Sequence, residues 1–104
     1  MKKFEVTVAQ KSENGKKTNE TRRERLIVRR NRRLIARYYY WSELKRLRFD
    51  DVLNLLQEEE FFIKERNIMN IINDNNSYLD SLIRNGVTSK QLKKEYPVFN
   101  WSMN

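Results

Sequence analysis

The chain has 104 residues and a net charge of +8, so we expect one small domain with a modest core. It has neither cysteine nor histidine, which excludes disulfides and thiolate metal sites and removes the commonest general base and zinc ligand. Only two glycines and one proline occur, and this scarcity favours long helices over a sheet with many turns.

The positive charge is concentrated in one part of the chain. Residues 16–48 carry thirteen basic and three acidic side chains, a net charge of +10. Residues 49–104 carry six basic and nine acidic side chains, a net charge of −3. Such asymmetry indicates an anionic polymer or surface as partner. A solvated helical face over an ordinary core is the alternative explanation of the same charges.

Residues 1–20 are expected to form a flexible N-terminal arm before a helical domain of residues 21–104. Phe4, Val6 and Val8 alternate with polar residues, which is typical of either a short strand or a frayed arm. The start of the chain lacks the apolar block of a signal peptide, and no apolar run approaches the roughly 20 residues of a membrane span. We therefore expect a cytoplasmic protein without membrane contact.

The segment TRRERLIVRRNRRLIARYY, residues 21–39, predicts a long amphipathic helix. Thr21 and Glu24 have the spacing of a capping box, so the helix is expected to start there. At 100° per residue, one side collects the apolar residues Ile27, Val28, Leu34, Ile35, Tyr38 and Tyr39, which are expected to pack inward. The other side collects Arg22, Arg23, Arg25, Arg29, Arg30, Arg32, Arg33 and Arg37.

Beyond residue 39 the apolar side changes, because Tyr40, Trp41, Leu44 and Leu47 fall where the arginines lay before. No strong helix breaker occurs here, so we expect an unbroken helix with a differently packed end, in which Tyr40 need not point inward. A second helix is predicted over residues 50–60. Its acidic first turn suits the helix dipole, and its buried stripe is Val52, Leu53, Leu55 and Leu56.

The second helix leads into the apolar connector Phe61, Phe62 and Ile63, which is expected to tuck into the core. A third helical region begins near Lys64 and stays in phase through residue 83, as one helix or as two separated by the polar residues 73–76. Gly86 is expected to end it. Residues 87–97 predict a short helix capped by Thr88 or Ser89, followed by a tail whose Val98, Phe99 and Trp101 fold back.

The stretch FDDVLNLLQEEEFFIKERNIMNII, residues 49–72, resembles a helix-turn-helix motif. Arg33 to Ile72 is similar to short transposase-associated DNA-binding proteins of bacterial mobile elements. The resemblance implies an all-α fold: a trihelical helix-turn-helix core with a long basic first helix and an extra C-terminal helix. The turn lacks the usual glycine and is several residues longer, and Leu53 replaces a small residue, so we expect a wider turn than usual.

If the third helix enters a major groove, its exposed flank meets base edges. That flank carries Arg66, Asn67, Asn70 and Asn73, and arginine and asparagine are suited to guanine and adenine. Phosphate contacts are expected from Arg22, Arg25, Arg29, Arg32, Arg33 and Lys64. The hypothesis requires both sets to form one continuous surface. Polar residues also belong on any exposed helical face, and that explanation stays open for each residue.

The function predicted from the sequence is therefore non-enzymatic binding of double-stranded DNA by a regulator or accessory factor of a mobile element. A protein-interaction or assembly module whose basic face docks an acidic partner is the alternative, and RNA is a less favoured ligand. Many such domains dimerise, and Trp41, Phe99 and Trp101 are candidates for a homodimer surface.

Catalysis is not expected. The dense carboxylates Asp50, Asp51 and Glu58 to Glu60 lie on neighbouring turns of one predicted helix, whereas a two-metal centre needs carboxylates from separate elements. We expect no metal, no cofactor and no small-molecule substrate.

Overall fold

The computed structural model describes residues 21–103, and the predicted arm of residues 1–20 lies outside the described residues. Every regular element in the described range is helical, which confirms the all-α prediction. The elements in chain order are α1 (Arg22–Tyr39), the π-helical turn η1 (Tyr40–Leu44), α2 (Phe49–Asn54), the π-helical turn η2 (Leu55–Glu60), α3 (Glu65–Asp74), α4 (Asn76–Asn85) and α5 (Ser89–Glu95).

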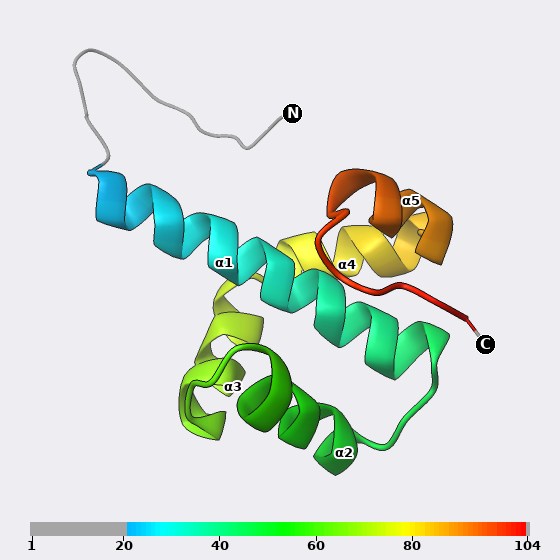
Figure 1. The fold of residues 1–104 in the computed structure, drawn as a ribbon, viewed down its shortest axis with the longest axis horizontal. Coiled ribbons are helices and arrows are strands. Elements are labelled where there is room, and N and C mark those ends of the chain that lie inside the picture. The colour runs from blue at the N-terminus through cyan, green and yellow to red at the C-terminus, as the bar shows by residue number, and fades with distance from the viewer. Residues whose placement is uncertain (1–20, 104) are drawn as a thin grey trace.

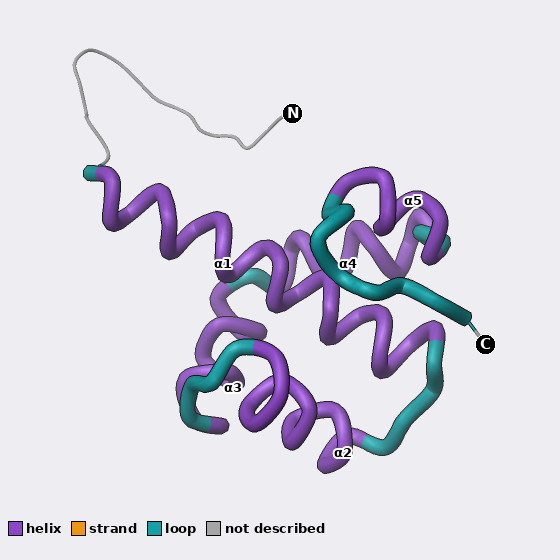
Figure 2. Tube along the Cα trace, viewed as in Figure 1, coloured by secondary structure: helices purple, strands orange, loops and turns teal. Residues whose placement is uncertain are grey.

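The first helix is the axis of the fold. It runs diagonally between α2 and α3 on one side and α4 and α5 on the other, and the C-terminal tail crosses over it (Figure 1). Loops join these helices without any strand in the described part of the chain (Figure 2). The unbroken path from α1 into η1 and from α2 into η2 agrees with the two helices expected around residue 40 and over residues 50–60.

Local sequence signals fix several helix ends. The Thr21 hydroxyl accepts a hydrogen bond from the Glu24 backbone N–H, and the Glu24 carboxylate accepts one from the Thr21 N–H, so the predicted capping box is confirmed. Thr88 makes the same arrangement with Gln91 at the start of α5. Gly86 ends α4 with a left-handed φ of 57°, a conformation that suits glycine.

The third helical region is two helices. Asn75 interrupts it with φ −113° and ψ 27°, and its side-chain amide donates to the Ile71 carbonyl at 2.8 Å. An asparagine side chain that bonds nearby backbone competes with helix continuation, which is the physical reason for the break. The two halves therefore take different directions, and α4 makes a more extensive contact with α1 than α3 does.

A compact core lies around the second half of α1. The largest fully buried side chains are Leu34, Ile35, Val52, Leu56, Ile68 and Leu92. They come from α1, α2, η2, α3 and α5, so each element contributes an apolar stripe to one cluster. Tyr40 is also buried, and Leu55 in the predicted stripe of the second helix is only half-buried.

Arg37 does not belong to the exposed arginine face where the helical wheel puts it. It is 4% exposed, and its guanidinium donates to both carboxylate oxygens of Glu60 and to the carbonyl of Asn100. The rings of Tyr40, Trp41, Phe99 and Trp101 surround it, with centroids 4.7–5.2 Å from its central carbon. The prediction for Arg37 was wrong because η2 and the tail cover that side of α1.

The aromatic residues expected at a homodimer surface face the interior instead. Trp101 is buried, and its indole N–H donates to the Tyr96 carbonyl at 2.7 Å. Trp41 and Phe99 are half-buried against the core, and the Trp41 indole donates to Glu60. The tail therefore folds back as predicted, except for Val98, which stays exposed, and these rings are not available as a set for a partner.

The connector between η2 and α3 only partly enters the core. Phe61 packs against Phe99, with ring centroids 5.9 Å apart, and Ile63 is half-buried. Phe62 is 74% exposed, so its predicted burial was wrong. Its φ of 58° turns its side chain away from the interior while its neighbours point inward.

We expect Arg37→Met to destabilise the fold by about 3–5 kcal/mol, because it leaves the Glu60 carboxylate buried without a cation. Urea unfolding followed by circular dichroism measures the change. The double substitution Arg37→Met with Glu60→Leu should recover much of the loss, since no unpaired charge then remains.

A matched control is the exposed pair of Arg48 and Asp51, whose nitrogen and oxygen lie 3.4 Å apart. Arg48→Ala should cost less than about 1 kcal/mol. An Arg37→Met effect as small as this control would contradict the role given to the buried pair.

Candidate nucleic-acid interface

The first half of α1 stands clear of the rest of the molecule. The helix has 18 residues, which corresponds to about 27 Å of length. Residues 34–37 are buried on all sides, whereas every residue from Arg22 to Arg29 is exposed. Figure 1 shows this end of α1 extending beyond the other helices. We call residues 22–30 the projecting segment.

The apolar side of the projecting segment has nothing packed on it among the described elements. Ile27 and Val28 are 37% and 48% exposed, although they continue the stripe of the fully buried Leu34 and Ile35, seven residues further on. Their predicted burial was wrong. The helical pattern was right, but α1 is longer than the layer of helices that covers it.

The charge of this part of α1 is not compensated within the described chain. Between residues 22 and 33 there are seven arginines and one acidic residue, Glu24, which is engaged in the cap. The two ion pairs among residues 21–103 are Arg37 with Glu60 and Arg48 with Asp51. None of the seven arginines therefore has a carboxylate partner in this range, and a concentrated positive potential results.

The five arginines predicted to bind phosphate form a stripe on one side of α1, which we call the arginine belt: Arg22, Arg25, Arg29, Arg32 and Arg33. Arg32 lies over the Tyr78 ring of α4, 4.1 Å from its centroid. Tyr40, two turns beyond Arg33 on the same stripe, contacts the Trp101 ring and donates its hydroxyl proton to the Ser102 carbonyl. The belt therefore lies on the side of α4 and the C-terminal tail.

Arg32 has a structural partner that the other belt arginines lack. The Tyr78 hydroxyl lies 2.8 Å from the Tyr96 hydroxyl, and burial, the main cause, raises the pKa of Tyr78 well above its ordinary value. A guanidinium above a ring that stays neutral gains a cation–π contact. Arg32 thus helps to hold α1 on α4, while Arg22, Arg25 and Arg29 remain exposed.

The residues predicted to contact bases lie on the outer surface of α3. Arg66, Asn67, Asn70 and Asn73 are all exposed, opposite the buried Ile68 and Ile71, and Lys64 is exposed immediately before the helix. However, α3 packs on the side of α1 away from α4 (Figure 1). The expectation that the belt and this flank form one continuous surface is therefore wrong, because the belt faces α4 and the tail.

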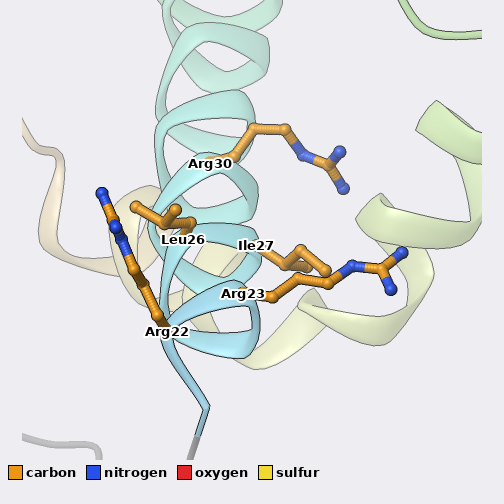
Figure 3. A pocket seen from close by; sticks show the side chains of 5 residues that line it. All are labelled: Arg22, Arg23, Leu26, Ile27 and Arg30. Atoms are coloured by element: carbon orange, nitrogen blue, oxygen red, sulfur yellow. The ribbon is translucent and has the colours of Figure 1, made fainter.

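A further group of residues on the projecting segment has no place in the predicted site. Arg23, Ile27 and Arg30 point to the same side of α1 and, with Leu26 and Arg22, line a shallow hollow (Figure 3). Their spacing of four and three residues is the signal in the sequence, since it places them on neighbouring turns of one face. The surface is both apolar and basic.

The described residues contain no group of three or more acidic side chains placed to hold a metal ion. None of the described helices combines the length and the apolar character that crossing a bilayer requires. Comparison with protein-family models, with curated proteins and with solved structures finds no match to this chain.

Because no other described element packs on the apolar side of the projecting segment, we expect its apolar side chains to add little to stability. At low protein concentration, Ile27→Ala should change the unfolding free energy by no more than about 0.5 kcal/mol. Leu34→Ala, two helical turns further along the same apolar stripe, should cost about 2–5 kcal/mol. Urea unfolding of both variants measures the difference, and equal losses would show that the segment is packed in solution.

Proposed function

We propose that this chain is a non-enzymatic protein that binds double-stranded DNA, as a regulator or accessory factor, with the exposed arginines of α1 on phosphates. The observation that carries the proposal is the charge of the projecting segment, where Arg22, Arg25 and Arg29 face solvent and pair with no carboxylate among residues 21–103. Arginine–phosphate contacts release counterions and give affinity for any duplex sequence.

The helix-turn-helix interpretation adds a second part to the proposal. In it α3 lies in a major groove, with Arg66 and Asn70 at base edges and Asn67 and Asn73 beside them. Exposure of this flank supports the assignment. Because the belt lies on another side of α1, the single footprint that the sequence predicted is given up, and α3 is proposed as a second, separate contact with DNA. The two contributions should therefore act independently.

The phosphate part is tested with Arg25→Ala combined with Arg29→Ala. We expect weaker binding to every duplex sequence, and the plot of log affinity against log salt should lose about two units of slope, one per contact. Fluorescence anisotropy with a labelled random duplex at several salt concentrations measures both quantities.

Lys93→Ala combined with Lys94→Ala is the matched control, because it removes the same charge from exposed positions on α5. Binding should stay close to that of the unaltered chain. If the control weakens binding as much as the α1 variant does, net charge rather than the arginine belt determines affinity, and the proposed site is wrong.

The α3 part is tested with Arg66→Ala combined with Asn70→Ala. Selection of bound duplexes from a random pool should yield a sequence preference for the unaltered chain, and the variant should lose about 1–3 kcal/mol of discrimination per base contact. Affinity for the unselected pool should hold. A uniform loss for all sequences would contradict the assignment of α3 to base edges.

One observation favours the alternative function, an interaction module for an acidic protein. Leu26, Ile27 and Val28 are 37–50% exposed among the arginines, and phosphate groups gain nothing from covering aliphatic side chains. A partner that combines carboxylates with apolar residues would satisfy both features of this surface.

A further inference from the structure

The hollow on the projecting segment exposes aliphatic and arginine side chains next to one another. Leu26 is 50% exposed and lies beside Ile27, and the two are bordered by Arg22, Arg23 and Arg30. Figure 3 shows the arginine side chains extending past the aliphatic ones. A complementary surface needs apolar atoms at its centre and carboxylates at its rim.

The same molecule carries such a surface elsewhere. A second shallow groove on α2 and η2 is lined by Leu47, Asp51, Asn54, Leu55, Glu58 and Glu59. Leu47 in this groove is 37% exposed. Asp51 pairs with Arg48 at the surface and Glu58 accepts from Gln57, both exposed interactions that contribute little and are easily exchanged. This groove holds part of the net negative charge of residues 49–104.

We propose that the projecting segment of one copy docks in the acidic groove of a second copy. In this contact Leu26 and Ile27 of one copy pack against Leu47 and Leu55 of the other. Three arginines, Arg22, Arg23 and Arg30, face the three carboxylates of Asp51, Glu58 and Glu59. The charge of each surface would be repulsive toward itself, so the contact joins unlike surfaces of two copies.

Each copy has one segment and one groove, and this determines the assembly. When both contacts form in the same pair, a symmetric dimer closes, and the buried area doubles. A single contact repeated from copy to copy gives an open chain instead. A helix segment this short covers little surface, so the closed pair with two contacts is the more stable product.

The proposal does not depend on DNA binding. The arginines tested for phosphate contact, Arg25 and Arg29, are absent from the hollow, which shares only Arg22 with the belt, and the experiment contains no nucleic acid. Self-association without DNA binding, or the reverse, can therefore be observed separately.

The test measures the molar mass of the full chain by sedimentation velocity over a wide range of protein concentration. The unaltered chain should form dimers as concentration rises. Arg23→Glu combined with Arg30→Glu should weaken association at least about tenfold, because it places like charges together. Glu58→Lys combined with Glu59→Lys should do the same from the other side of the contact.

The decisive step is to mix the two variants. Their reversed charges complement each other across one contact, so an equimolar mixture should regain one-to-one complexes that neither variant forms alone. Lys93→Glu combined with Lys94→Glu reverses the same amount of charge on α5 and should leave association unchanged. Circular dichroism checks that every variant is folded.

Three results would overturn the proposal. The unaltered chain could stay monomeric at every concentration, as it would if the hollow were covered within its own chain. The α5 control could weaken association as strongly as the segment variant. The mixture of the two reversed variants could fail to associate although each is folded.

Discussion

The buried guanidinium of Arg37 joins three parts of the chain that are distant in sequence. It fixes α1 to the end of η2 through Glu60 and to the C-terminal tail through Asn100. Four aromatic rings exclude water around it. A buried charge removed from water is costly unless every donor finds a partner. The tail and η2 must therefore be in place together, and this requirement determines which half of α1 is covered.

Because the second half of α1 is the covered half, the first half is left in solvent. The helix is covered on all sides around residues 34–37, and the elements that cover it end before they reach Val28. Isolated helices shorter than about 12–15 residues are marginal in water, so the projecting segment depends on its continuation into the packed half and on the Thr21 cap. The core thus uses only the second half of α1, and the basic first half extends into solvent without loss of core contacts.

Signals between residues close in sequence were predictable. The Thr21 cap, the Gly86 stop, the short final helix and the two-helix alternative around Asn75 all rest on hydrogen bonds or dihedral preferences within a few residues. The all-α class follows from the same signals together with apolar periodicity.

Features that depend on contacts between residues distant in sequence were not predictable. Arg37 lies on the charged side of its helix, and its burial depends on Glu60, 23 residues away, and on the Asn100 carbonyl in the tail. Leu26 and Ala36 both interrupt the arginines on this side of α1, yet only Ala36 is buried, so these exceptions in the sequence did not identify the covered half. Phe62 was assigned to the core because it is apolar, yet the turn gives it a positive φ that points it outward. The separation of the arginine belt from the α3 flank likewise follows from how helices pack, which periodicity alone does not determine.

The two proposed contacts can coexist on one helix, and their combination has a physical consequence. Arg23, Ile27 and Arg30 point to one side of the projecting segment, whereas Arg25 and Arg29 belong to the belt on another. A segment docked in the groove of a second copy engages Arg22 but keeps Arg25 and Arg29 exposed, and docking restrains a helix that the other described elements hold at one end only. A dimer presents two belts at fixed separation, so the second belt meets the same duplex at a high effective concentration. Self-association would then raise DNA affinity without any new protein–DNA contact. Salt would weaken both steps, since both rest on exposed charges.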